Sequence, residues 1–160
     1  MLCKILKLRP KIDKQFAVSL SFYIAKYAKQ FEFDPAISVA IAMQESSLSN
    51  KNRMGTVLKD GKFVRGITDV GVFQIHVDTM ADLNNTGNRI DYQRLLADIG
   101  YQTYWHAKIL SAKIKTCKAK RATLKVSAGN EWSCYHSFTY TKRKTYLKDV
   151  SRHIVKLTSL

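Results

Sequence analysis

Apolar positions recur at helical spacing along the first third of the chain. In residues 14–32 they return every three or four positions, which predicts one amphipathic helix. Asp34 and Pro35 then form a typical helix start, an N-cap followed by a first-turn proline, and predict a second helix to about Leu48. The chain is therefore expected to open with two consecutive helices.

The spacing changes in residues 53–76. Short apolar pairs there flank the turn dipeptide Asp60-Gly61, which predicts a small β-hairpin. The apolar run over residues 70–75 is expected to lead back toward the core.

Helical signals return in the second half, with a polar break at residues 127–130. Asp78 or Thr79 is suited to cap a short helix, and Asp91 is suited to cap a long one. The expected helices cover residues 78–84, 92–120, 131–138 and 142–157. We predict a mainly α, α+β architecture in one domain over residues 1–160, with a helical body and a small β-hairpin lobe beside a cleft.

The composition excludes collagen-like and disordered chains, because 46% of the 160 residues are hydrophobic and only seven are Gly and two Pro. Charges interrupt the N-terminal region before an apolar run of signal-peptide length develops. No segment reaches the length of a membrane span. We therefore expect neither a signal peptide nor a transmembrane segment.

The net charge is +15, and it is concentrated in the last third, where thirteen basic residues stand against Glu131 and Asp149. Such a field attracts polyanions. Nucleic acid, acidic membrane surfaces and the anionic polymers of a bacterial envelope all remain open as partners on charge alone.

The cysteines Cys3, Cys117 and Cys134 are odd in number and far apart, so we predict thiols rather than a disulfide framework. Together with the four histidines they show no paired ligand spacing of the zinc type. The sequence predicts no metal and no cofactor.

Glu45 is the residue that departs from its surroundings. It continues the column of Ile37 and Ile41 on the predicted second helix, where burial and the negative end of the helix dipole both disfavour a carboxylate. Burial raises the pKa of such a carboxyl and makes it suitable as a general acid at neutral pH. The alternative is a glutamate that caps a loop or pairs with a basic residue.

Three blocks of sequence resemble lytic transglycosylases and related enzymes of the lysozyme fold. Ala42-Met-Gln-Glu-Ser-Ser-Leu48 resembles their Glu-Ser motif, and Thr68-Asp-Val-Gly-Val-Phe-Gln-Ile75, followed by Thr79, resembles their Gly-Leu-Met-Gln-Ile segment. Trp132-Ser-Cys-Tyr-His-Ser137, with Tyr146 and Val150 after it, resembles the end of that fold, and its Tyr-His-Ser is similar to the branch associated with secretion systems. The blocks occur in the order of the family.

The resemblance implies that Glu45 is the single catalytic acid and base. It implies a substrate-binding set of Ser46, Phe73, Gln74 and Tyr135. Gly71 and Thr79 would be structural parts of the motif. For three of these residues a structural role is the alternative to substrate binding. Ser46 could hold the turn after the helix, and Phe73 and Tyr135 could pack in the core. Residues 50–66 are longer than the usual segment of the soluble enzymes, and His136 replaces their Asn, so contacts from those two places do not carry over.

Asp69 keeps a second reaction open. Its segment also resembles that of animal-type lysozymes, in which a second carboxylate faces the catalytic Glu. Retaining hydrolysis needs such a group, whereas a lytic transglycosylase needs one Glu only. An aspartate also occurs here in the secretion-associated transglycosylases, and the Tyr-His-Ser block indicates the same branch, so we favour the lyase.

The expected substrate is the glycan strand of peptidoglycan. Basic segments 108–125 and 142–156 would bind anionic envelope polymers, and other virion or secretion-apparatus proteins are further candidate partners. With no signal peptide, we expect a bacteriophage protein for entry or lysis, virion-associated or made in the host cytoplasm and acting on the wall from the periplasm. The rivals are a nucleic-acid-binding protein and a structural virion protein, although no recognition module for specific nucleic acid is present.

Overall fold

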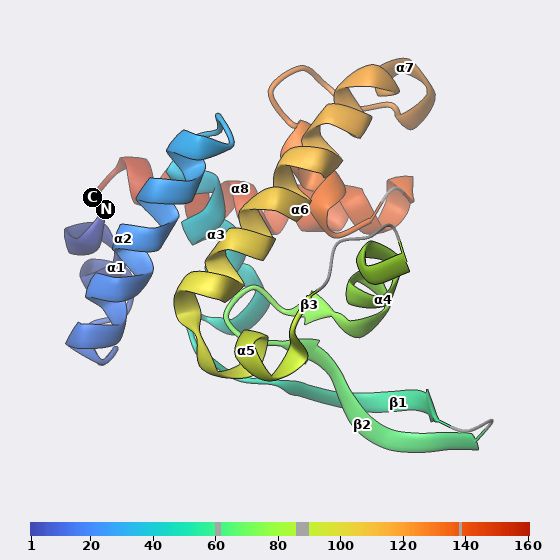
Figure 1. Ribbon diagram of the computed structural model, residues 1–160. Coiled ribbons are helices and arrows are strands. Elements are labelled where there is room, and N and C mark those ends of the chain that lie inside the picture. Colours follow the sequence, from blue (N-terminus) through green and yellow to red (C-terminus); the bar gives the residue numbers. More distant parts are fainter. Residues whose placement is uncertain (60–61, 86–89, 138) are drawn as a thin grey trace.

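The computed structural model describes residues 1–59, 62–85, 90–137 and 139–160, and it is mostly helical with one small antiparallel sheet (Figure 1). The helices are α1 (Leu2–Leu8), α2 (Lys14–Gln30), α3 (Pro35–Ser46), α4 (Val77–Asn85), α5 (Tyr92–Ala97), α6 (Ile99–Ala119), α7 (Arg121–Leu124), the 3-10 helix η1 (Glu131–Tyr135) and α8 (Tyr140–Thr158). The strands are β1 (Arg53–Lys59), β2 (Lys62–Val70) and β3 (Ile75–His76). The predicted mainly α architecture with a small β part is confirmed.

The two opening helices form where the pattern predicts them. The Asp34 carboxylate caps α3 by accepting from the backbone N–H of Ala36, and Pro35 occupies the first turn. The helix ends at Ser46, earlier than predicted, because Ser47 and Leu48 both adopt left-handed backbone conformations. Leu48 then points into the core, which fixes the exit of the chain from α3.

The predicted long helix over residues 92–120 is broken at Asp98. The backbone of Asp98 is extended, and its carboxylate caps the second piece by accepting from the Tyr101 N–H at 3.0 Å. The prediction of one continuous helix is therefore wrong. The capping aspartate was the available signal, but continuous apolar spacing across it concealed the break.

Other helix boundaries also differ from the predicted ones. At the start of α4 the His76 ring accepts from the Asp78 N–H, so neither Asp78 nor Thr79 is the cap. The segment predicted as a helix over residues 131–138 is a 3-10 turn in its first part, and residue 138 lies outside the described residues. The pattern analysis also missed α1, although its Ile5 is completely buried.

The sheet follows the order β1-β2-β3, and the long β1–β2 hairpin projects from the helical body (Figure 1). In this register Asp69 on β2 lies opposite Arg53 on β1 and His76 on β3. The predicted turn at Asp60-Gly61 lies outside the described residues. The base of the hairpin therefore brings acidic and basic side chains together beside the helices.

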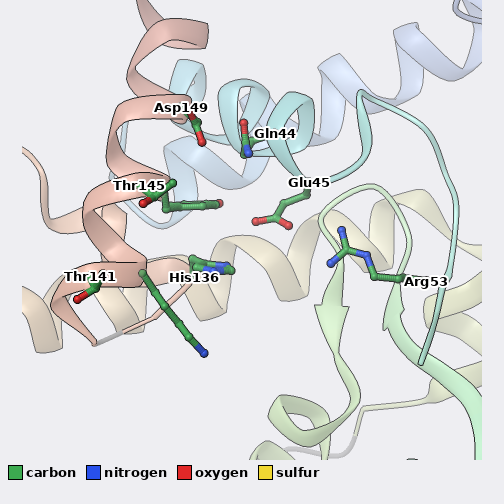
Figure 2. A pocket seen from close by; sticks show the side chains of 9 residues that line it. Gln44, Glu45, Arg53, His136, Thr141, Thr145 and Asp149 are labelled. Carbon is green, nitrogen blue, oxygen red and sulfur yellow. The ribbon is translucent and has the colours of Figure 1, made fainter. Parts of the chain in front are cut away.

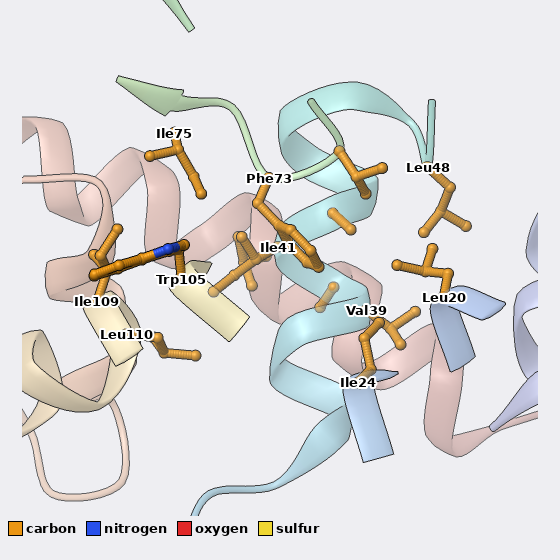
Figure 3. Close-up of a cluster of buried hydrophobic side chains, with 14 of the residues drawn as sticks. Leu20, Ile24, Val39, Ile41, Leu48, Phe73, Ile75, Trp105, Ile109 and Leu110 are labelled. Carbon is orange, nitrogen blue, oxygen red and sulfur yellow. The ribbon is translucent and has the colours of Figure 1, made fainter. Parts of the chain in front are cut away.

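The core lies between α2, α3 and α6 and includes the loop before β3 (Figure 3). Figure 3 shows Trp105 of α6 on one side of this apolar cluster and Leu20 of α2 on the other, with Ile41 of α3 and the Phe73 ring between them. None of the helices in the described ranges is long and apolar enough to cross a bilayer.

Cys117 and Cys134 form a disulfide, with Cα atoms 6.3 Å apart. The prediction of thiols is wrong for this pair, whereas Cys3 is free and exposed. The two cysteines are 17 positions apart, and α7 with its following loop returns the chain so that η1 packs on α6. The disulfide joins η1, which carries Tyr135, to the C-terminal part of α6.

Candidate active site

Two cavities meet at Glu45 and form one cleft. The larger, of about 510 Å³, is lined partly by α8 and is called here the α8-side cavity (Figure 2). The smaller, of about 270 Å³, lies against the sheet and is called the sheet-side cavity. Glu45, Arg53 and His136 line both. Figure 2 shows the Glu45 carboxylate between α8 and the Arg53 side chain.

Glu45 has an unusual protonation equilibrium. It is in the last turn of α3, and burial raises its pKa from 4.5 to about 7. The Tyr146 hydroxyl and the positive charge of Arg53 oppose this rise, while the negative charge of Asp69 adds to it. Near neutral pH both forms of the carboxyl are populated, which is the condition for a group that donates and later accepts a proton.

Two tyrosine hydroxyls face this region. Tyr146, from α8, is almost completely buried, and both burial and the adjacent Glu45 raise its pKa. Its hydroxyl has no hydrogen-bond partner within the described residues, and the same hydroxyl lowers the pKa of the neighbouring Glu45 carboxyl. Tyr135 lines the sheet-side cavity and donates to the Phe73 carbonyl at 3.2 Å. The structure thus brings Tyr135 into the same cavity as Glu45.

Asp69 also lines the sheet-side cavity, so both carboxylates singled out in the sequence belong to one cleft. Its Oδ2 atom accepts from the Thr68 hydroxyl at 2.9 Å and lies 3.9 Å from the Arg53 guanidinium. Asp69 is therefore already engaged by two groups at the base of the hairpin, whereas Glu45 projects between the cavities.

Phe73 does not reach the cleft. It is 0% exposed, and its ring stacks on the His106 ring with centroids 3.8 Å apart. The predicted role of Phe73 in substrate binding is wrong, and the packing alternative holds. His106 is likewise a core residue: its Nε2 atom is 2.9 Å from the Ser38 hydroxyl, and burial lowers its pKa to about 3.

Ser46 holds the turn after α3. Its hydroxyl donates to the Val72 carbonyl at 2.8 Å and accepts from the Ser49 N–H at 3.1 Å. These bonds join the C-terminal end of α3, which carries Glu45, to the segment before β3. This is the alternative role predicted for Ser46, and neither cavity includes it among its lining residues.

Gln74 and Thr79 both line the sheet-side cavity. The Gln74 amide also donates to the carbonyls of Lys51 and Gly71, each at 2.6 Å. The side chain therefore joins the segment before β1 to the loop before β3. Thr79, predicted as structural, comes from α4 and faces the same cavity.

Gly71 is required by space and by backbone conformation. Its φ of +71° favours glycine, and a Cβ atom would lie 2.1 Å from the Gln102 side-chain oxygen. That oxygen accepts from the Val72 N–H, while the Gln102 amide donates to Asn50. The close neighbour is thus a side chain of α6, and Gly71 has the structural role that the resemblance implies.

Several lining residues were not identified from the sequence. Arg53 was placed only within a hairpin, and Tyr146 only at the end of a motif. His136 stacks on the Tyr146 ring with centroids 4.8 Å apart, and burial, followed by the charges of Lys142 and Arg53, lowers its pKa. No local pattern marks these side chains, because only tertiary packing brings them to Glu45. Within the described ranges, no three His, Cys, Asp or Glu side chains form a group that could hold a metal ion.

The pKa of Glu45 should respond in opposite directions to two substitutions. Tyr146→Phe removes the hydroxyl that lowers it, so the pKa should rise. Asp69→Asn removes the charge that raises it, so the pKa should fall. A carbon-13 NMR titration of the Glu45 carboxyl would measure both. Shifts in the same direction would contradict this account of the electrostatics.

The chain matches no protein-family model, no curated protein and no solved structure, so the inference of function rests on the site itself.

Proposed function

We propose that this protein is a peptidoglycan lytic transglycosylase with a lysozyme-like fold. It would cleave the β-1,4 bond between N-acetylmuramic acid and N-acetylglucosamine and leave a 1,6-anhydromuramyl end. The observation that carries the proposal is Glu45, whose pKa is raised to about 7 where the two cavities of one cleft meet. The second support is the resemblance of three sequence blocks to lytic transglycosylases, the first of which contains Glu45.

In the first half of the reaction Glu45 acts as the acid. The protonated carboxyl gives its proton to the glycosidic oxygen while the bond from that oxygen to C1 of the muramyl residue breaks. Burial keeps a useful fraction of Glu45 protonated at neutral pH, which an exposed glutamate would not provide.

In the second half the resulting Glu45 carboxylate acts as the base. It takes the proton from the C6 hydroxyl of the same muramyl residue, and that oxygen forms the new bond to C1. No water enters, and Glu45 ends protonated as it began. Tyr146 and Arg53 stabilise the carboxylate form between the two steps, since both lower the pKa of Glu45.

A hydrolytic N-acetylmuramidase is the second candidate, and one observation favours it. Asp69 lines the same cavity as Glu45 and is suitably charged to assist at the opposite side of a sugar. We favour the lyase because Thr68 and Arg53 already engage Asp69. The lyase also matches the Tyr-His-Ser block.

The setting is part of the proposal. A wall-cleaving enzyme with a net charge of +15 would adhere to anionic envelope polymers through its basic C-terminal third, and this adhesion would weaken with salt. We propose a bacteriophage role in entry or lysis, with a secretion apparatus as the other setting.

Mass spectrometry of the muropeptides released from purified peptidoglycan tests the reaction. Products that end in 1,6-anhydromuramic acid support the lyase. Reducing-end products would assign hydrolysis and make Asp69 a catalytic partner. Absence of any product at every pH between 5 and 8 would refute both and leave the binding or structural-protein interpretation of the basic charge.

A further inference from the structure

The α8-side cavity has a lining unlike that of a plain sugar site. One face of α8 contributes Thr141, Thr145 and Asp149, each four residues from the next, and Lys142 lies beside them. Figure 2 shows Thr141, Thr145 and Asp149 along α8, with Glu45 opposite. At about 1.5 Å per residue, this face extends roughly 12 Å along the helix.

The charges in this cavity have both signs. Lys142 and Arg53 supply positive charge, and Asp149 supplies negative charge beyond that of Glu45. In intact strands the lactyl carboxyl of N-acetylmuramic acid is amide-linked to the peptide, so the sugars themselves carry hydroxyl and amide groups but no charge. They would cover these charged side chains without pairing with them, at a cost in desolvation. A ligand with both carboxylate and ammonium groups would pair with them.

Aromatic surface for stacking on a sugar is also scarce here. The two rings that line this cavity, His136 and Tyr146, stack on each other, and Tyr146 is only 5% exposed. The remaining lining side chains are polar or charged. The lining therefore fits a peptide backbone and its charged groups better than the apolar face of a sugar ring.

We propose that the α8-side cavity binds the peptide attached to muramic acid, so that the preferred substrate is peptide-bearing rather than naked glycan. This inference rests on the proposed function. Lys142 pairs with a peptide carboxylate, Asp149 pairs with a peptide amine, and the hydroxyls of Thr141 and Thr145 bond to the peptide backbone between them. An extended peptide advances about 3.3 Å per residue, so the 12 Å face matches three to four residues.

The ion pair that Asp149 already forms with Arg152 is compatible with a peptide amine binding to Asp149. Asp149 lies 3.2 Å from Arg152, whose side chain is 64% exposed. An ion pair exposed to this degree contributes little, so a peptide amine can replace Arg152 at small cost. The neighbouring charge of His153 is reduced as well, because burial first, and then Lys156, lower its pKa.

The test compares two substrates prepared from the same peptidoglycan: intact strands, and strands whose peptides have been removed by an amidase. The ratio of kcat/KM for intact to stripped strands should be about ten in the wild-type protein, and Lys142→Ala and Asp149→Asn should each lower it about threefold, as expected for partly exposed charge pairs. Lys148→Ala is the matched control, since it removes an equal charge from an exposed position of α8 outside both cavities. Its ratio should stay at the wild-type value.

The outcomes separate this inference from the proposed function. A wild-type ratio near one, with both substrates cleaved, would overturn the peptide site and leave the glycosidase intact. A ratio that Lys148→Ala lowers as much as Lys142→Ala would show a general charge effect and would also overturn the site. No cleavage of either substrate would refute the proposed function and the inference with it.

Discussion

The Glu45→Gln variant should release products from peptidoglycan at least about a thousandfold more slowly than the wild-type protein, because glutamine can neither donate a proton to the glycosidic oxygen nor take one from the C6 hydroxyl. The substitution is nearly isosteric, so the cleft should keep its shape. Chromatographic quantification of released muropeptides over time measures the effect. Residual activity within tenfold of the wild type would exclude Glu45 as the acid and base.

The loss must come from chemistry and not from unfolding, and the pKa of Glu45 allows this to be checked. Folding raises that pKa from 4.5 to about 7, so the folded state holds the proton more tightly than the unfolded state. The stability gained from this proton is present below pH 4.5 and is lost as the pH rises through 7. Glu45→Gln should therefore be more stable than the wild type at pH 8, by about 1–3 kcal/mol, and no more stable at pH 4.

Glu32→Gln is the matched activity control. Glu32 is exposed in the turn that follows α2 and lines neither cavity. This variant makes the same chemical change and should cleave peptidoglycan at the wild-type rate.

Gly71→Ala should destabilise the fold by about 3 kcal/mol, from overpacking against Gln102 together with a left-handed backbone conformation that alanine disfavours. For a chain of this length that loss corresponds to a fall of roughly 6–12 °C in Tm. Because Gln102 accepts from the Val72 N–H, displacing it also disturbs the segment to which Ser46 is bonded. Thermal unfolding followed by circular dichroism measures the change.

Gly129→Ala separates the two causes. Gly129 has a φ of +85°, but a Cβ atom there would meet nothing within 4 Å. Its substitution should therefore cost only the backbone part, about 1 kcal/mol. Equal losses for the two variants would mean that the contact with Gln102 contributes nothing.

Local signals predicted the elements that carry the site. Asp34 and Pro35 mark the start of α3, and the spacing from Ile37 to Glu45 correctly indicated a carboxyl on a buried face. The resemblance failed for Phe73, because the motif sequence is the same whether the Phe73 ring faces the cleft or stacks on His106. Periodicity likewise ran across Asp98 without revealing the break between α5 and α6.

By itself the sequence determined what depends on near neighbours in the chain: the helix starts, the hairpin, the column that contains Glu45, and the basic charge of the last third. Helix caps, apolar periodicity and net charge are properties of short segments, so they can be read without knowing the fold. Only the tertiary structure decided which groups surround Glu45. Tyr146 lies about a hundred residues further along the chain, and the Cys117–Cys134 disulfide joins segments that no periodicity relates. The protonation of Glu45 depends on burial, on the Tyr146 hydroxyl of α8 and on charges from β1 and β2, and packing alone brings these elements together.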